Sequence, residues 1–466
     1  MAASLAEPEP QPLFPLRKYT IIFTVSWITL ASTFASTSIL SAMPEIASDL
    51  STTIEIISIT NAALLAAMGF SRLIWGPIAA AFGRIPAYNA AVFVLMITCI
   101  ATALSTALAG FTVTRVLGGL SGTTFMIIGQ EVVSDICSSG VQGTAIGIFL
   151  SGSVIGPALG PCIGGIIVSY TTWRVIYWVQ TAMVGVGLVL SLWVMRGIPN
   201  SHEHPSTPKT QPSKLATRLH LMYSEANPIK ALQYLLVPNI LLTVLTCSLL
   251  STYQYFLLTT IRMTINPRFA FTTPLTSGLF YIAPGAGFLF GSILGGWVSD
   301  QTMRYYSDKS TSTNATRPQV PPHIRLRACL PNLFVVFPAA MMAYGWTLQA
   351  RRGGLAVSIV TSFVGGACLM GAYTALNTYL GEALPSHRSA ILAEKFILQY
   401  GVAAISSSIA VPLVNSIGVG ITFTIYMFAS PTVAATIPVG GVLTLAVAVY
   451  GAEMQAWAMK RFPTLH

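Results

Sequence analysis

Residues 151–165 read SGSVIGPALGPCIGG and lie inside a long apolar run. Glycine and proline make up seven of these fifteen residues, although in a soluble helix each glycine costs about 1 kcal/mol and an interior proline about 3 kcal/mol. In lipid such residues are tolerated, because small side chains let helices approach closely and neighbouring helices satisfy the carbonyls that proline frees. We therefore predict a membrane-spanning helix with a packing seam or a flexible hinge, formed by Gly152, Gly156, Pro157, Gly160, Pro161 and Gly164.

The whole chain is far more apolar than an average globular protein. Its 466 residues are 53% hydrophobic and only 8% charged, with a mean hydropathy of +0.69. Segments such as 86–110 and 431–450 carry no Asp, Glu, Lys or Arg, and about 20 such residues are enough to cross a bilayer. The composition therefore indicates a polytopic membrane protein that is embedded in the lipid bilayer.

Hydropathy and helix-breaking residues predict an all-α fold of twelve transmembrane helices in two six-helix bundles. We expect a disordered cytoplasmic tail at 1–19, an N-terminal bundle at 20–196, a cytoplasmic linker at 197–235 with a short amphipathic helix at 215–235, a C-terminal bundle at 236–457 and a cytoplasmic tail at 458–466. The acidic, proline-rich start is not a cleavable secretory signal. The predicted spans are 20–43, 56–80, 86–108, 111–133, 143–169, 173–195, 237–260, 274–298, 326–347, 354–380, 389–413 and 423–456.

The basic residues orient these spans. With the N-terminus in the cytoplasm, most of the 24 Lys and Arg residues fall on the cytoplasmic side, as the positive-inside rule expects. This topology predicts that both chain ends are cytoplasmic and that Lys395 lies at the cytoplasmic side. The net charge of +10 is then mainly a topology signal, and we expect no binding to nucleic acid.

The two predicted bundles share a short repeat. Gly118-Gly119 precedes Asp135 by the same separation at which Gly365-Gly366 precedes Glu382. Each acid begins a short loop on the predicted cytoplasmic side. Parallel repeats of this kind are typical of transporters whose two halves rock around a central pathway.

These residues resemble the major facilitator superfamily, in particular the twelve-span drug:proton antiporters of fungi, over about residues 20–456. The stretch 152–165 is similar to the antiporter signature of the fifth span, and Arg115 with Gly119 is similar to a motif of the fourth span. Segments 173–180 and 227–242 also resemble the fungal group. The resemblance implies a monomeric secondary transporter, by default of the plasma membrane, that exports a small organic compound in exchange for protons.

The resemblance also implies that spans 5 and 8 pack across the boundary between the bundles. Span 8 carries its own stripe of small residues, so we expect the two glycine stripes to face each other at this boundary. That second stripe consists of Gly287, Gly291 and Gly295.

A loop motif of the family is only partly present in the first half. Gly76, Gly83 and Arg84 fit the motif after span 2, but Ala80 stands where an aspartate is usual. We therefore expect a lopsided charge cluster at the cytoplasmic side, because the second half keeps the pattern better, with Gly296, Asp300 and Arg304.

Two arginines lie inside predicted spans, where an ionisable residue is costly and often functional. Arg115 matches the family motif near the substrate and proton pathway, and Arg72 lies in span 2; snorkelling or a local pairing is the structural alternative for both. No Asp or Glu lies in the middle of a predicted span, and a cationic substrate would need such a carboxylate. Guanidinium groups suit carboxylates, so we predict an anionic or neutral substrate.

Polar side chains on other spans are further candidates for the pathway, with interhelical packing as the alternative. Thr29, Ser32, Thr33 and Ser36 are spaced so that they share one face of span 1. The remaining candidates are Tyr253, Gln254, Tyr255, Tyr373, Asn377 and Gln399.

The exported compound is predicted to be an organic acid or an acidic metabolite, with a broad exporter of neutral drugs as the runner-up. An uncoupled facilitator or channel and a transporter-like sensor are kept as alternatives. A membrane-embedded enzyme is disfavoured, because all six histidines fall in predicted loops or the tail and no phosphate-binding loop is present. The six cysteines are scattered singly, so we expect neither a metal site, a cofactor nor a disulfide framework.

Overall fold

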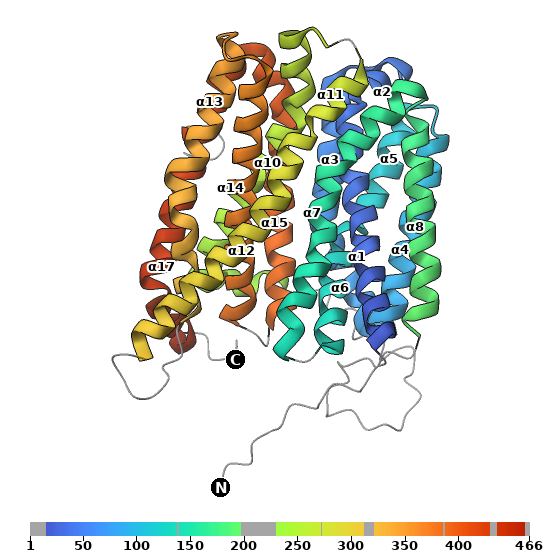
Figure 1. The fold of residues 1–466 in the computed structure, drawn as a ribbon. Helices are drawn as coiled ribbons and strands as arrows, with labels where there is room; N and C mark the ends of the chain where they lie inside the picture. The colour runs from blue at the N-terminus through green and yellow to red at the C-terminus, as the bar shows by residue number, and fades with distance from the viewer. Residues whose placement is uncertain are drawn as a thin grey trace.

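The computed structural model describes residues 15–137, 139–196, 230–271, 273–311, 321–384, 387–428 and 436–461, and within these ranges it contains helices and no β-strand. Twelve of these helical segments are long and apolar enough to cross a membrane. They form two groups that stand side by side, one coloured blue to green and the other yellow to red (Figure 1). The predicted all-α fold of two six-helix bundles is thereby confirmed. Residues 1–14, 197–229 and 462–466, which include most of the predicted linker, lie outside the described residues.

The first bundle divides its fourth span into two helices. Leu120 and Ser121 separate them, because the glycines at 118, 119 and 122 weaken the helix there. The helices of this half are α1 (Pro15–Thr37) with η1 (Ser38–Ser41), α2 (Met43–Asp49), α3 (Ile54–Phe82), α4 (Arg84–Leu104), α5 (Leu108–Gly119), α6 (Gly122–Ile136), α7 (Ser139–Tyr170) and α8 (Arg174–Val194).

The second bundle departs from the predicted spans at its end. The predicted span 423–456 is wrong, because residues 419–428 form a separate short helix and the last spanning helix begins later. Of the predicted amphipathic helix at 215–235, only residues 230–235 are described, and they belong to a 3₁₀ helix. The elements are η2 (Lys230–Leu236), α10 (Pro238–Phe269), α11 (Pro274–Phe280), α12 (Ile282–Thr311), η3 (Pro322–Cys329), η4 (Asn332–Val336), α13 (Phe337–Gln349), α14 (Gly354–Ala383), α15 (Arg388–Ile417), α16 (Val419–Phe428) and α17 (Thr436–Arg461).

The molecule has two distinct ends. Helix α1 begins and helix α17 ends at the same end, which we name the terminal end (Figure 1). The opposite end carries α2 and α11, and we name it the distal end. Between the two ends the bundles meet along α3 with α15, and along α7 with α11 and α12.

The repeat seen in the sequence is also a repeat in packing. A Cβ atom added to Gly118 would lie 3.0 Å from Thr98 of α4, and one added to Gly119 would lie 2.6 Å from the carbonyl of Leu64 in α3. In the second half, Gly365 contacts α13, and a Cβ at Gly366 would lie 2.6 Å from a carbonyl of α12. Each glycine pair therefore lets the fourth helix of its half approach the second and third helices of that half.

The glycine stripe of α7 packs inside its own bundle. Side chains added at Gly152, Gly156, Gly160 and Gly164 would collide with α1 and η1; at Gly160 the nearest atom is the Thr37 hydroxyl, at 2.6 Å. The Thr37 hydroxyl also donates a hydrogen bond of 3.2 Å to the Gly156 carbonyl. The stripe is thus a packing seam. This is one of the two interpretations offered from the sequence, a packing seam or a flexible hinge.

The expectation that the two glycine stripes face each other is wrong. Gly287, Gly291 and Gly295 lie against α14, the partner of α12 within the second bundle. The contact between the two bundles is made by residues two positions away from the stripes. There, a Cβ at Gly285 would lie 2.8 Å from Ala158. Two residues correspond to about 200° around a helix of 3.6 residues per turn, so this contact uses the opposite faces of α7 and α12. Nearer the distal end, Gly165 and Gly278 meet, and a Cβ at Gly165 would lie 2.8 Å from the Gly278 Cα.

Candidate functional site

Arg115 is buried at the centre of the first bundle. Its side chain comes from α5 and is only 3% exposed. The guanidinium donates hydrogen bonds to the Asn61 side chain at 2.7 Å and to the Tyr177 hydroxyl at 2.8 Å, and a longer one of 3.4 Å to the Ala35 carbonyl. Its central carbon also lies 5.8 Å from the ring centre of Phe111. The side chain therefore does not extend to the surface, as snorkelling would require.

No carboxylate forms an ion pair with Arg115 within the part of the chain that the structure describes. All three hydrogen-bond acceptors are neutral, so a positive charge is buried without a compensating negative charge. Leaving such a charge uncompensated costs several kcal/mol. The site is therefore suited to a bound anionic group.

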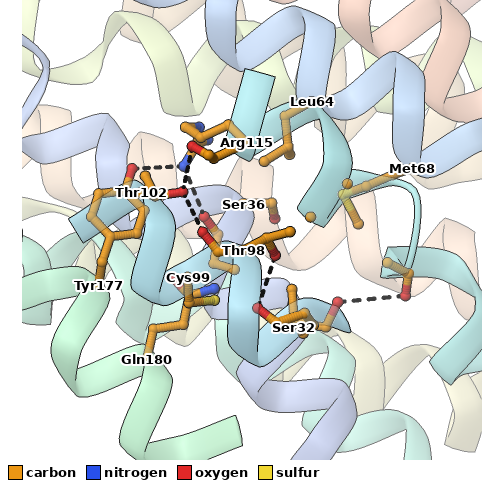
Figure 2. Close-up of a pocket in the computed structure, with 16 residues that line it drawn as sticks. Ser32, Ser36, Leu64, Met68, Thr98, Cys99, Thr102, Arg115, Tyr177 and Gln180 are labelled. Atoms are coloured by element: carbon orange, nitrogen blue, oxygen red, sulfur yellow. Dashed lines mark hydrogen bonds between the residues drawn. The ribbon is translucent and has the colours of Figure 1, made fainter. Parts of the chain in front are cut away.

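A cavity of about 30 Å³ adjoins the guanidinium, which is room for about two water molecules. Buried polar atoms around it have no hydrogen-bond partner, among them the Gln180 Oε1 and the Arg115 Nε. Figure 2 shows that Arg115, Tyr177 and Gln180 lie on one side of this space, across from Met68 and Ser32. The cavity is lined by Ser32, Ala35, Ser36, Leu64, Met68, Leu95, Thr98, Cys99, Thr102, Thr114, Arg115, Gly118, Gly119, Gly122, Tyr177 and Gln180.

The four candidates on span 1 separate into two environments. Ser32 and Ser36 line the cavity, whereas Thr33 lies against the glycine stripe of α7. Thr29 and Thr33 donate their hydroxyl hydrogens to carbonyls of their own helix. Only the serines are therefore placed to contact a molecule in the cavity.

Aromatic residues connect this cavity to the second bundle. Tyr255 of α10 is 4% exposed, and its hydroxyl interacts with Ser36 of α1 and with Tyr400 of α15. Tyr255 and Tyr400 belong to one apolar cluster with Leu64 and Met68 of the first bundle. The centre of the molecule is therefore closed by aromatic and aliphatic side chains from both halves.

The other candidates of the second half lie deeper in their own bundle. Tyr253 donates a hydrogen bond to the Met341 sulfur and packs edge-on against Phe337, so it belongs to the bundle core. Tyr373 donates to the Cys247 carbonyl at 3.0 Å and accepts a bond of 3.5 Å from Gln399. Gln254 is buried, and Asn377 is half-buried with its Oδ1 lacking a partner.

Arg72 is half-buried in α3 and lies apart from Arg115 and its cavity lining. A Cβ added to Gly76 would lie 3.3 Å from the Arg72 Nε. The glycine one turn later therefore gives the Arg72 side chain room to lie along its own helix.

Each half has an arginine with two carboxylates at the terminal end. Arg84 is paired with Asp135 at 2.5 Å and with Glu131 at 3.8 Å. The residue before it, Gly83, has a positive φ of 95°, a backbone conformation that favours glycine. The expected lopsided cluster is therefore wrong, because Glu131 of α6 supplies the second carboxylate that Ala80 cannot. In the second half Arg325 is paired with Asp300 at 2.6 Å and with Glu382 at 2.8 Å.

Arg304 does not take the place that the loop motif predicts for it. Its side chain is exposed, and Arg325 from the next segment of chain pairs with Asp300 instead. Gly296 has open space beside it, with Thr374 at 3.6 Å from an added Cβ. The motif therefore identified the carboxylate correctly but not its partner.

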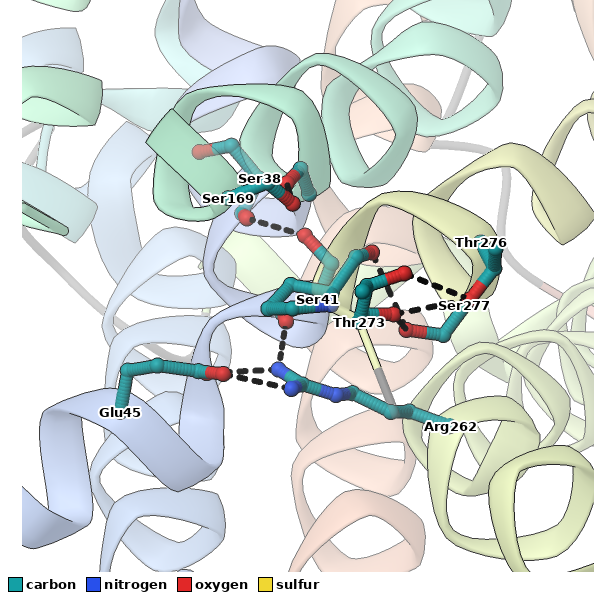
Figure 3. A network of polar contacts seen from close by, with 10 residues as sticks. Ser38, Ser41, Glu45, Ser169, Arg262, Thr273, Thr276 and Ser277 are labelled. Carbon is teal, nitrogen blue, oxygen red and sulfur yellow. Dashed lines mark hydrogen bonds and ion pairs between the residues drawn. The ribbon is translucent and has the colours of Figure 1, made fainter. Parts of the chain in front are cut away.

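The two halves are joined by polar contacts at both ends. At the distal end, Arg262 of α10 donates to both carboxylate oxygens of Glu45 and to the Ser41 carbonyl (Figure 3). At the terminal end, the Gln130 side chain of α6, turned with its oxygen toward Arg388 of α15, accepts bonds of 2.5 and 3.1 Å. Burial lowers the pKa of the Arg388 guanidinium, and the charge of Glu382 opposes this shift.

A further ion pair braces the first half at the distal end. Arg174 pairs with Asp49 at 2.7 Å. Hydrogen bonds from Arg174 and Trp173 hold the pKa of the Asp49 carboxyl below its ordinary value. The ion pair therefore connects the end of α2 to the start of α8.

The sequence analysis missed two buried ionisable residues of α15. Glu394 is 0% exposed and accepts a hydrogen bond of 3.0 Å from the backbone N–H of Tyr234 in η2. Lys395, which the sequence analysis counted only among the basic residues of the cytoplasmic side, has a side chain that is only 3% exposed. A helical projection of 389–413 would have shown Lys395 and Gln399 one turn apart on the same face.

Comparisons with known proteins agree with this architecture. The sequence profile of the Major Facilitator Superfamily matches residues 25–405. "Efflux pump radE" from Floropilus chiversii is 26% identical over 88% of this chain and 77% of the relative, and "MFS antiporter QDR3" from Candida albicans is 21% identical over 88% of this chain and 75% of the relative.

Solved structures share the fold at low sequence identity. A peptide transporter crystallised in complex with sulfate superposes with a TM-score of 0.66 at 15% identity, covering 96% of this chain and 97% of the other. A D-xylose-proton symporter gives 0.63 at 12% identity, with 93% and 96% covered. The twelve spans and the profile match lead to one assignment: this chain is a multi-pass membrane transporter and belongs to the major facilitator superfamily.

Proposed function

We propose that this transporter exports a small organic acid or acidic metabolite in exchange for protons. The observation that carries the proposal is the Arg115 guanidinium, which is buried beside a cavity and has only neutral acceptors. A carboxylate can accept two parallel hydrogen bonds from a guanidinium. Binding of an acid would therefore supply the negative charge that this site lacks.

Export and an exchange mechanism are supported by the relatives' printed names, which include an efflux pump and an antiporter. For substrate to pass, the cavity must open to one side of the membrane at a time. Rocking of the bundles about their glycine-rich boundary would achieve this, because Gly165 with Gly278 and Gly285 with Ala158 present almost no side chain there. The contacts of Arg262 and of Arg388 would then separate alternately.

A broad exporter of neutral drugs is the second candidate. The observation that favours it is the apolar cluster at the centre, which includes Tyr255, Phe396 and Tyr400. Aromatic and aliphatic side chains of this kind bind flat, uncharged molecules without selecting a particular polar group.

The test is transport by the full-length protein in vesicles with an imposed pH gradient. We expect carboxylic acids to accumulate in response to the gradient, and we expect their methyl esters and cationic dyes not to. Flux that is unchanged when the gradient is collapsed would instead support an uncoupled facilitator. Transport of the esters alone would support the neutral-drug exporter.

The placement in the cell follows from the same proposal. We place the terminal end in the cytoplasm, because most basic residues lie there, and we place the protein in the plasma membrane as a monomer. A protease-sensitive tag at residue 466 would remain protected in intact cells. Cleavage of that tag from outside would reverse the orientation.

A further inference from the structure

Lys395 is a second buried cation, and it lies in the other half of the molecule. It sits on α15 seven residues after the helix begins at Arg388, about 10 Å along the helix at 1.5 Å per residue. Its side chain is 3% exposed and its ammonium nitrogen lies 4.3 Å from the ring centre of Phe396. Phe396 belongs to the apolar cluster that joins the bundles, so Lys395 lies beside the central boundary.

The ammonium group has no carboxylate partner among the described residues. Its chain neighbour Glu394 does not fill this role, because no ion pair joins the two residues and Glu394 instead accepts a hydrogen bond from the backbone N–H of Tyr234. The one aromatic ring beneath Lys395 offsets only part of the cost of burying the charge, about 2 kcal/mol. An anion that binds beside this ammonium group would supply the missing negative charge.

Polar groups from three helices gather around Lys395. Gln399 lies one turn later on the same face, is 8% exposed and has no partner for its Oε1. Cys247 of α10 is close enough to interact with the lysine charge. Tyr373 of α14 donates to the Cys247 carbonyl and accepts from Gln399, which holds these groups together.

We infer that Lys395 and Gln399 form a binding site for the carboxylate end of the transported acid in the second half of the molecule. Lys395 would donate to a carboxylate oxygen, and the free Gln399 oxygen would accept from a hydroxyl of the substrate or from its protonated oxygen. This inference rests on the proposed function and deepens it, since it assigns the acidic group of the substrate to a named pair of residues.

The two buried cations also differ in their hydrogen-bond partners. Arg115 already bonds to Asn61 and Tyr177, whereas no acceptor within hydrogen-bonding distance of Lys395 occurs in the described ranges. An entering carboxylate therefore need not displace an existing hydrogen bond at Lys395. A lysine is also a compact charge on a flexible stem, which can follow the substrate as the halves move.

The experiment compares acids with their esters on purified full-length protein. The probes are benzoate, salicylate and decanoate, each against its methyl ester, and the readouts are the thermal unfolding midpoint and equilibrium binding. The variants are Lys395→Met, Lys395→Arg, Gln399→Leu and Arg115→Gln. Lys460→Met is the control, because Lys460 is an exposed lysine near the end of α17.

We expect at least one acid to raise the midpoint of the wild type while its ester does not. Lys395→Met should weaken the Kd for that acid by about tenfold or more, which is the range for hydrogen bonds to charged groups. Lys395→Arg should retain part of the binding, and Lys460→Met should retain all of it. A cooperative unfolding transition without ligand would show that each variant is folded, even where its midpoint is lowered.

Three outcomes would overturn the inference. If the acid binds Lys395→Met as tightly as the wild type while Arg115→Gln loses binding, the proposed function stands and the Lys395 site is wrong. If only esters bind the wild type, the acid substrate itself is wrong and the site falls with it. If none of the three acids binds the wild type, the inference is likewise abandoned.

Discussion

Arg262 and Glu45 form a two-bond ion pair, with distances of 2.6 and 2.5 Å, between the second half of the molecule and the first. The Arg262 side chain is 10% exposed and that of Glu45 is 30% exposed. Because the pair is partly shielded from water and both bonds are charge-assisted, it contributes more than a surface ion pair. Among the described residues, it is a charge-assisted connection between the bundles at the distal end.

Breaking this pair is expected to open the distal end. Arg262→Met removes both bonds, and we expect it to shift the conformational equilibrium toward distal opening by about tenfold. The measurement is the labelling rate of a Ser38→Cys reporter by a membrane-impermeant maleimide, since Ser38 is 1% exposed in the closed form. The native cysteines among the described residues are all buried, so the reporter signal can be separated from the background.

Glu45→Met serves as the matched partner of that variant. If the pair acts as a unit, the double variant should label no faster than either single variant. Labelling that is unchanged in all three variants would show that the apolar boundary alone closes the distal end.

Arg115→Ala is expected to abolish transport while the protein still reaches the membrane. The side chain bonds to three elements of the first bundle, so we also expect a loss of about 3 kcal/mol in the free energy of unfolding. Transport in vesicles and surface expression separate the two effects. The control is Arg351→Ala, at an exposed residue in the turn before α14, which should transport like the wild type. Normal flux in Arg115→Ala would contradict the proposed site.

Gly156→Ala tests the seam between α7 and α1. An added Cβ would overlap the Thr33 hydroxyl, so we expect destabilisation of about 1–3 kcal/mol and reduced transport. Gly147→Ala is the matched control on the same helix, because nothing lies within 4 Å of a Cβ built there. Equal thermal midpoints in the two variants would mean that α7 can move away from α1 at little cost.

The same comparison applies to the second stripe. A Cβ at Gly291 would overlap the Ala367 carbonyl of α14, whereas one at Gly401 of α15 would meet nothing within 4 Å. We expect Gly291→Ala to lower the unfolding midpoint and Gly401→Ala to leave it unchanged or raise it. A normal midpoint in Gly291→Ala would contradict the tight contact between α12 and α14.

Arg325→Ala and Arg304→Ala distinguish the observed charge cluster from the expected one. Arg325 is bonded to Asp300 and Glu382, so its loss should cost about 1–3 kcal/mol. Arg304 is exposed, and we expect its loss to change stability by less than about 0.5 kcal/mol. Chemical denaturation of both variants is the measurement, and a larger effect at Arg304 would favour the motif over the structure.

The repeat of glycine pairs could be predicted from sequence, because close helix contact depends on residue size at a fixed spacing. The same reasoning placed Gly156 and Gly291 on seams but assigned the wrong neighbours. A helical period shows which residues share a face, yet it does not show which helix that face contacts. The partners of these two residues, Thr33 and Ala367, were fixed only by the packing of whole bundles.

For the charged residues too, some roles could be predicted from the sequence and others could not. Arg115 was recognised because, with Gly119 four residues later, it matches a motif of the fourth span. Lys395 was missed because hydropathy estimates depth but not direction, and a lysine close to a span end is assumed to extend to water. For Glu131, pairing with some Arg or Lys was expected, but Arg84 was not identified as the partner, since Glu131 reaches that arginine from a different helix and no local motif includes it.

The boundary between the halves has a consequence for the speed of transport. At Gly165 with Gly278, and at Gly285 with Ala158, the helices touch through backbone and a single methyl group. Interlocked side chains would have to change rotamers before one half could turn against the other, whereas these surfaces can slide without that step. The activation free energy of reorientation should then depend on the polar contacts at the two rims and on the central apolar cluster between α3 and α15, rather than on the α7 side of the boundary.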